Sequence, residues 1–322
     1  MKILRLLALL LIVSSCSMMH DDLSGCQQEL RVRFRYDMNM EFADAFTQQV
    51  KTLTLYAYSP DGLLAFERTE KVEDIVARGG YMTLDNVTPG HYSLYVWAEG
   101  EQRHTDSYTY GGPATDGAQS LTSRVSRQTK ELNHDLTPLF HGKLTDADLS
   151  LEGHGVATVT VPLVKNTNII RVVLQNASGE RLNQTDFSFF IDDDNTFLAY
   201  DNAPLPDDSV CYRPWSQYDG VVGDDSKMSA VVAEMTVNRL LTSKHPRLRV
   251  RNNLNGKTIF SIPLNDYALL VKGNYNKKMT DQEYLDRQSE YNFVFFIDDN
   301  HNWLAASILI NSWTVVLHNT DI

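Results

Sequence analysis

The chain has only three cysteines among its 322 residues and a net charge of −12, and both features exclude classes of function. No Cys-x-x-Cys spacing is present, so neither a redox site of the thioredoxin type nor a zinc ribbon is expected. The excess of acidic residues disfavours nucleic acid as a partner, because phosphate backbones are bound mainly by lysine and arginine. A Gly-x-Ser-x-Gly elbow, a P-loop, a dinucleotide fingerprint and a His-Glu-x-x-His motif are also absent. We therefore expect no enzyme and no cofactor.

Two acidic clusters are the strongest metal candidates in the sequence. Asp192–Asn195 and Asp298–Asn300 each follow an apolar run and offer the oxygen ligands that calcium prefers. Neither has the Asp-x-Asp-x-Asp-Gly spacing or the distal glutamate of a known calcium loop. Acidic turns between strands explain both clusters without a metal.

A short apolar leader opens the chain. Lys2 and Arg5 precede Leu6–Val13, a run too short to span a bilayer and typical of a secretory signal peptide. Small residues then lead into Cys16, as in a bacterial lipobox, so we expect removal of residues 1–15 and lipidation of Cys16. An ordinary secretory signal with a chance cysteine is the alternative. No second apolar stretch approaches membrane-spanning length, so the lipid is the expected anchor, each buried CH₂ contributing about 0.8 kcal/mol.

The two remaining cysteines form a potential disulfide. Cys26 and Cys211 are the only pair left once Cys16 carries lipid, and an exported protein can keep a disulfide. The sequence does not place their Cα atoms within bonding distance. A bridge and two separate thiols therefore both remain open.

Alternating apolar and polar residues predict a mainly β protein. Leu30, Val32, Phe34 and Tyr36 alternate with three arginines, which indicates a half-buried strand. Turn signals separate further strands and predict hairpins; they lie at residues 60–62, 88–90 and 255–256. The sequence from 111 to 132 is weakly periodic and predicts a long loop with a helical piece.

The strand pattern divides the chain into two halves. It restarts near Gly155, which predicts a lipidated tether at 16–26, one sandwich at 27–154 and a second at 155–322. Thr280 and Glu283 form a capping box, and they predict a short helix from there to about residue 290. The fold class is thus all-β, with two tandem antiparallel β-sandwich domains and one or two short helices.

The last strand pattern, from residue 303 to 317, is apolar on both of its faces. It predicts either a central strand of its own domain or a strand offered to a neighbouring subunit, which would bind through main-chain hydrogen bonds. The residues expected to contact such a partner are Ile308, Ile310, Trp313, Val315 and Leu317.

Aromatic residues that are expected at the surface support a different function. Tyr108, Tyr110 and Trp215 are suited to stack on sugars, although both residue types are also common in strands. A surface lipoprotein that binds glycans is therefore an alternative, since fold alone does not settle function.

The order of motifs resembles the FimB-type anchor and minor-subunit lipoproteins of type V fimbriae, found in Gram-negative anaerobes. The resemblance covers most of the mature chain, and one departure from it is Ser312, where glycine is expected. The segments that carry it are 21–26, 36–40, 44–46, 84–97, 161–163, 168–172, 212–215, 282–287 and 308–313.

The resemblance implies transthyretin-like sandwiches and a structural role without catalysis. Such a protein sits in the outer membrane of the cell through its lipid and binds fimbrial shaft subunits at the surface. It keeps its own first strand, Leu30 to Tyr36, and therefore has no groove for another subunit's strand. It gives a strand instead, Ser307 to Leu317, and so ends the polymer. A fimbrial tip or minor adhesin of the same family is the nearest alternative.

Overall fold

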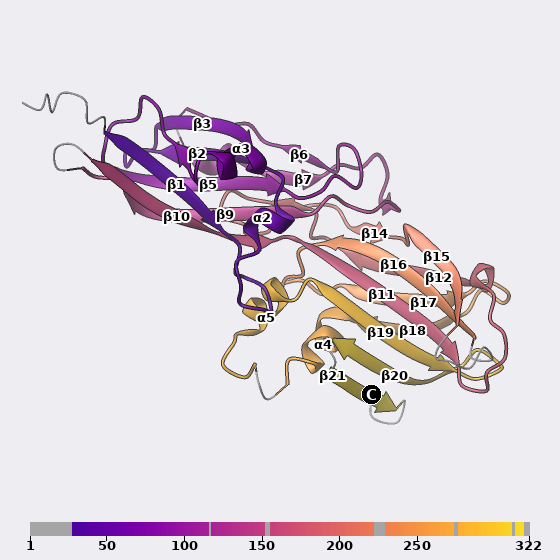
Figure 1. Cartoon of the computed structure of the whole chain (residues 1–322). Coiled ribbons are helices and arrows are strands. Elements are labelled where there is room, and N and C mark those ends of the chain that lie inside the picture. The colour runs from indigo at the N-terminus through magenta and orange to yellow at the C-terminus, as the bar shows by residue number, and fades with distance from the viewer. Residues whose placement is uncertain are drawn as a thin grey trace, which may run out of the picture.

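The computed structural model describes residues 28–115, 117–151, 155–221, 229–273, 276–310 and 313–318, and for residues 306–310 and 313–318 it describes the backbone. These residues form two lobes joined end to end, each built mainly of strands (Figure 1). The first described strand begins at the outer end of the first lobe, and the last lies at a sheet edge of the second. The expected all-β class with two sandwich halves and short helices is confirmed.

The first lobe is one seven-stranded sheet with the order β3-β2-β5-β9-β10-β1-β4. The sheet curls over, so that Arg68 of β3 donates a hydrogen bond to the Thr83 carbonyl of β4 at 3.2 Å. The elements up to β10 are β1 (Glu29–Arg35), α2 (Phe46–Gln49), β2 (Thr52–Tyr58), β3 (Leu64–Lys71), α3 (Val72–Ala77), β4 (Met82–Thr83), β5 (His91–Glu99), β6 (Tyr108–Tyr110), η2 (Ala118–Ser120), β7 (Ser123–Val125), β8 (Glu131–Leu132), β9 (Leu139–Asp148) and β10 (Val156–Lys165).

The domain boundary in the structure follows β10 instead of preceding it. β10 pairs in parallel with β1 over seven residues, from Glu29↔Val156 to Arg35↔Pro162, and antiparallel with β9. The predicted boundary at residue 155 therefore differs from the sheet topology, in which the first lobe runs to Lys165. The sequence pattern restarts at residue 156 because a new strand begins there, but periodicity does not identify the partner of that strand.

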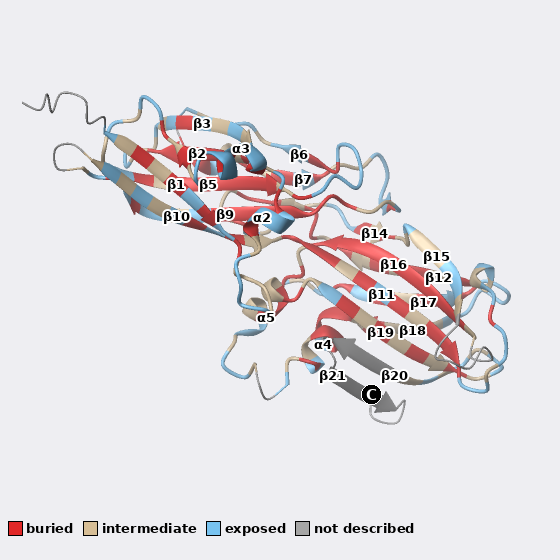
Figure 2. Cartoon of the chain, in the orientation of Figure 1, coloured by how far each residue is buried: buried red, intermediate tan, exposed pale blue. Residues whose placement is uncertain are grey.

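The second lobe packs a six-stranded sheet, β15-β16-β11-β19-β20-β21, against a five-stranded sheet, β18-β17-β12-β14-β8. Its strands alternate between buried and more exposed residues, as Figure 2 shows for β11 and β19. The elements are β11 (Thr167–Asn176), η3 (Gln184–Asp186), β12 (Phe187–Asp193), β13 (Phe197–Leu198), β14 (Val210–Tyr212), β15 (Ser216–Val221), β16 (Ser229–Asn238), β17 (Arg247–Asn252), β18 (Thr258–Pro263), α4 (Leu264–Leu270), α5 (Asp281–Arg287), β19 (Glu290–Ile297), β20 (Trp303–Ile310) and β21 (Trp313–His318).

Several local predictions are confirmed. β2 and β3 form a hairpin, with Gly62 at φ +84°, and β17 and β18 form another, with Gly256 at φ +72°. Both glycines occupy the left-handed region that a side chain disfavours. Helix α5 begins where the capping box predicts, because the Thr280 side chain accepts a hydrogen bond from the Glu283 backbone N–H.

Other strands pair with unexpected neighbours. The turn at residues 88–90 does not join a hairpin, because β4 pairs with β1 while β5 pairs with β2 and β9. The segment from 111 to 132, predicted as a loop with a helical piece, contains β7 and β8 besides the expected helical turn, and β6 directly precedes it. The sheets are also not wholly antiparallel: β1–β10, β11–β19 and β8–β14 are parallel.

The two lobes interlock through these short strands. β7 pairs with β13, and β8 pairs with β14, so strands from the first half complete sheets with strands from the second. One hydrophobic core includes Tyr58 and Trp97 of the first lobe together with Phe189 and Phe293 of the second. A second core lies within the first lobe, between its two curled layers. The shared core fixes the lobes to each other.

Candidate functional site

The C-terminal segment forms a two-stranded hairpin where one strand is expected. β20 pairs with β19 on one side and with β21 on the other, and the turn between β20 and β21 lies outside the described residues. Ile308 is opposite Val315, and Ile310 is opposite Trp313. Because residues opposite each other in antiparallel strands share a face, the hairpin places these positions, with that of Leu317, on one face of the sheet.

β21 is the outermost strand of its sheet. Its order places β20 on one side of β21, and no described strand lies on the other side. Such an edge presents a row of backbone N–H and C=O groups, which is a template for pairing with a strand of another chain. The edge of β21 is therefore a suitable docking site for a strand.

β1 occupies the interior of its own sheet. It lies between β10 and β4, and its inward side chains Leu30, Val32 and Phe34 are 3%, 0% and 5% exposed. Tyr36, which follows the strand, is also buried, and its ring packs edge-on against Phe140 at 5.1 Å between centroids. The position that an inserted strand would need is thus filled by the chain itself.

The lipidation and disulfide predictions fall mostly beyond the described residues. Cys16 and Cys26 both lie outside them, so lipidation of Cys16 and the Cys26–Cys211 bridge stay predictions. Cys211 lies on β14 opposite Asp192 of β12. Burial, helped by the Asp192 carboxylate, raises the pKa of the Cys211 thiol to about 11, so it is a weak nucleophile at neutral pH.

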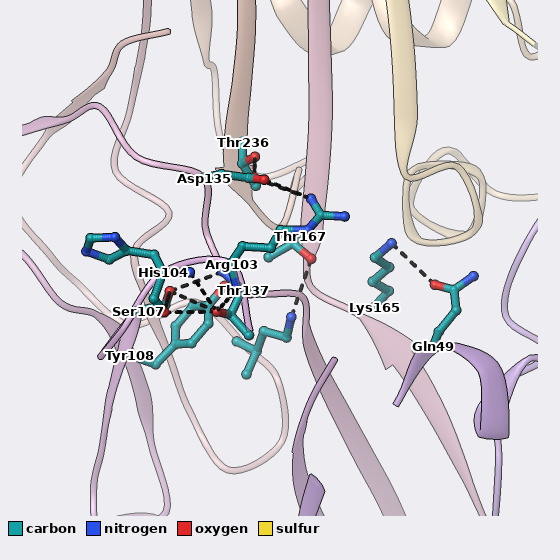
Figure 3. A network of polar contacts seen from close by, with 11 residues as sticks. Gln49, Arg103, His104, Ser107, Tyr108, Asp135, Thr137, Lys165, Thr167 and Thr236 are labelled. Atoms are coloured by element: carbon teal, nitrogen blue, oxygen red, sulfur yellow. Dashed lines mark hydrogen bonds and ion pairs between the residues drawn. The ribbon is translucent and has the colours of Figure 1, made fainter. Parts of the chain in front are cut away.

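A network of polar contacts stiffens the junction between the lobes (Figure 3). Thr137 is its centre: its backbone carbonyl accepts from the Tyr108 hydroxyl at 2.7 Å, and its Oγ1 accepts from the Arg103 backbone N–H at 3.1 Å. The Arg103 guanidinium pairs with Asp135 at 3.3 Å, and Asp135 accepts a hydrogen bond from the Thr236 hydroxyl of β16. No pattern in the sequence indicates these contacts, because they join residues that are 29 or more positions apart.

The acidic clusters have structural partners. Asp192 accepts from Arg249 at 2.6 Å, and Asp194 pairs with Lys244 at 2.7 Å. The Asp298 carboxylate accepts from the backbone N–H groups of Asn300 and Asn302, which closes the turn before β20. Within the described residues no group of three or more histidine, cysteine or acidic side chains is arranged to hold a metal ion. No helix among them has the length and apolar character needed to cross a membrane.

The three aromatic residues proposed as sugar contacts have different surroundings. Tyr108 is 8% exposed, and its hydroxyl is bound to Thr137. Tyr110 is 36% exposed, but its hydroxyl donates to Glu99 at 2.6 Å. Trp215 is 37% exposed and lines a surface cavity, and its side chain forms no hydrogen bond with the described residues. Tyr110 also lines surface cavities, so the free indole N–H distinguishes Trp215 from it.

Comparison with known proteins identifies relatives over most of the chain. A candidate polysaccharide-binding protein from Bacteroides thetaiotaomicron is 29% identical, with 92% of this chain and 100% of that chain covered and a TM-score of 0.78. A candidate adhesin from the same organism is 32% identical, with 90% and 97% covered and a TM-score of 0.76. The fimbrial anchor protein Mfa2 of Porphyromonas gingivalis shares the fold at 18% identity, with 91% and 99% covered and a TM-score of 0.66.

Among curated proteins no match is found. The family model for the fimbrillin-A associated anchor proteins Mfa1 and Mfa2 matches residues 23–319, which is most of the chain. The family expected from the order of motifs is thus confirmed, and it is a family of fimbrial accessory proteins. The chain belongs to the fimbrillin-A associated anchor proteins Mfa1 and Mfa2.

Proposed function

We propose that this protein anchors a fimbrium to the outer membrane through a lipid on Cys16 and binds the shaft through the edge of β21. The single observation that carries the proposal is the position of β21 at the end of the six-stranded sheet, with only β20 as its partner among the described strands. Family membership supports the fimbrial role, and the lipobox supports the anchor.

The buried first strand supports a place at the end of the polymer. β1 fills its own sheet through seven pairs with β10, so a strand from another subunit cannot enter there without displacing three buried side chains. A subunit that pairs with the shaft through the edge of β21, and whose own β1 occupies the place of an inserted strand, joins a chain of subunits at one end only. This asymmetry makes the protein a terminal subunit.

Deletion of residues 313–322 tests the strand-pairing step. The deletion removes β21 and leaves β20 as the sheet edge, so we expect the protein to remain in the membrane fraction while shaft protein detaches or fails to assemble. Thr258→Pro is the control, because it alters the exposed start of β18, an edge strand of the other sheet. Cell-bound fimbriae at normal level in the deletion strain would contradict pairing through β21.

Substitution of the lipidated residue tests the anchor separately. Cys16→Ala should abolish lipid attachment, and fimbriae that still carry this protein should be released into the medium. Cys211→Ala is the matched control, since it removes a cysteine without touching the lipobox. Recovery of the wild-type protein at the distal end of fimbriae by immunogold labelling would place it at the tip instead and refute the basal position.

A further inference from the structure

A polar cavity opens on the outer face of the six-stranded sheet, beside the junction of the lobes. Its volume is about 290 Å³. The buried residues of β11, Ile170 and Val172, point to the core, so Arg171 between them belongs to the opposite, outer face. The residues considered below are Arg103, Arg171, Trp215, Glu234, Glu290 and Asn292.

Three of the lining residues form a row across neighbouring strands. Glu234 of β16 is opposite Arg171 of β11, and Arg171 is opposite Asn292 of β19. Strands in a sheet lie about 4.8 Å apart, so the row extends over about 10 Å. That length suits hydrogen bonds to hydroxyl groups on both sides of a single sugar ring.

Trp215 provides an apolar wall at one end of the row. Its backbone N–H donates to the Glu234 carbonyl at 3.0 Å, which fixes the residue next to β16. Its side chain is 37% exposed, and no aromatic ring or guanidinium of the described residues stacks on it. An indole of this kind presents a flat apolar face and one N–H donor, and both features suit the C–H groups and hydroxyls of a pyranose.

The polar groups of the row retain hydrogen-bonding capacity. The Arg171 guanidinium forms an ion pair with Oε1 of Glu234, at 2.7 Å from its Nε and 2.5 Å from its Nη2. Glu234 is only 9% exposed, yet its Oε2 accepts no hydrogen bond from the described residues. Within the same set, the Asn292 side-chain amide forms no hydrogen bond. A carboxylate oxygen and a side-chain amide that are both without protein partners among the described residues are ready acceptors and donors for a ligand.

The charges of the cavity select against acidic ligands. Arg171 is paired with Glu234, and Arg103 is paired with Asp135, so these cations are neutralised. Glu290 also lines the cavity, and the nearby Lys165 ammonium group interacts with it electrostatically. The site therefore has no unpaired cation to bind a uronic or sialic acid, which leaves neutral sugars as the ligands that fit.

We propose that this cavity binds one neutral pyranose unit of a glycan. Trp215 stacks on the ring, while Glu234, Arg171 and Asn292 bind its hydroxyl groups. The site uses no residue of β1 or β21. Sugar binding and attachment of the shaft can therefore be gained or lost independently.

Calorimetric titration of the purified full-length protein tests the assignment. The probes are the methyl pyranosides of glucose, galactose, mannose and N-acetylglucosamine, with methyl glucuronide as the acidic comparison. At least one neutral sugar should bind in about the millimolar range expected of a single small ligand, and Trp215→Ala should weaken it at least about tenfold. Trp215→Phe keeps a ring and should retain part of the affinity.

Tyr218→Ala is the matched control. Tyr218 is 41% exposed on β15, opposite Val232, and does not line the cavity, so its loss should leave sugar affinity unchanged. An unchanged thermal unfolding temperature of Trp215→Ala would show that the variant is folded and has lost only the contact with the sugar. Normal fimbriae on cells with this variant would show that sugar binding is independent of fimbrial attachment. Failure of all four neutral sugars to bind, equal loss in Trp215→Ala and Tyr218→Ala, or tighter binding of the glucuronide would overturn the proposal.

Discussion

Removal of β1 should unfold the first lobe, and the size of the effect follows from its burial. The perturbation is a chain that begins at Asp37 and so lacks the whole strand. Three inward side chains of β1, those of Leu30, Val32 and Phe34, are at most 5% exposed. Burial of each stabilises a protein by about 1.5–3 kcal/mol, or roughly 5–9 kcal/mol together. The free energy of unfolding of a typical domain is about 5–15 kcal/mol, so the loss is comparable to the total stability of the lobe.

Urea unfolding, followed by circular dichroism and tryptophan fluorescence, measures this effect. The reference chain begins at Gln28 and keeps β1, and a peptide of residues 28–36 added to the shorter chain should restore structure. Arg33→Ala in the reference chain is the control, because Arg33 is exposed on the same strand and should change stability by less than about 0.5 kcal/mol. A chain beginning at Asp37 with the same urea midpoint as the reference would refute the reasoning.

Three further predictions concern buried groups. Burial raises the pKa of Asp193 to about 7, so the folded protein keeps a proton that the unfolded chain releases above about pH 4. The contribution of Asp193 to the free energy of unfolding therefore falls as pH rises from about 4 to about 7. Asp193→Asn should unfold at a higher urea concentration than wild type at pH 8, and at the same urea concentration or a lower one at pH 4. Gly142→Ala should destabilise by about 1–3 kcal/mol, since an added Cβ would lie 2.6 Å from Leu163 Cδ2; thermal unfolding measures it. Asn166→Leu should cost about 1–3 kcal/mol by leaving the buried amide of Asn202 without its two hydrogen bonds, and the double variant with Asn202→Leu should cost less than the sum of the single ones.

The sequence predicted those features that depend on neighbouring residues. Alternation identified the inward face of β1, Asn255-Gly256 identified the β17–β18 turn, and Thr280 with Glu283 identified the start of α5. These features are local, since period, turn chemistry and capping involve only a few consecutive residues.

Strand partners could not be predicted in the same way. β10 begins where a new pattern begins, but its parallel pairing with β1 joins residues separated by more than 120 positions, and nothing in either strand specifies it. The pattern from 303 to 317 likewise showed apolar residues on two faces without showing that a turn divides them into β20 and β21. The alternation of apolar and polar residues shows which face of a sheet each residue occupies. Which strands pair depends on the arrangement of the whole sheet.

The cavity proposed to bind a sugar is likewise built from residues that are distant in the sequence. Trp215 was a candidate from its residue type, together with Tyr108 and Tyr110. The choice among the three depends on exposure and hydrogen bonds, and the polar row beside Trp215 is assembled from three separate strands. Only the folded sheet brings these residues together.

The parallel pairing of β1 with β10 would have a mechanical consequence if the protein holds a fimbrium as we propose. A pull from the membrane would then enter at Glu29, the start of β1, and leave the first lobe at Lys165, the end of β10. Since the two strands run in the same direction, such a force slides one along the other, and all seven residue pairs resist it together. β11 and β19 repeat the arrangement in the second lobe over eight pairs. A hairpin pulled at its two adjacent ends would open one pair at a time, so both lobes are loaded in their stronger direction.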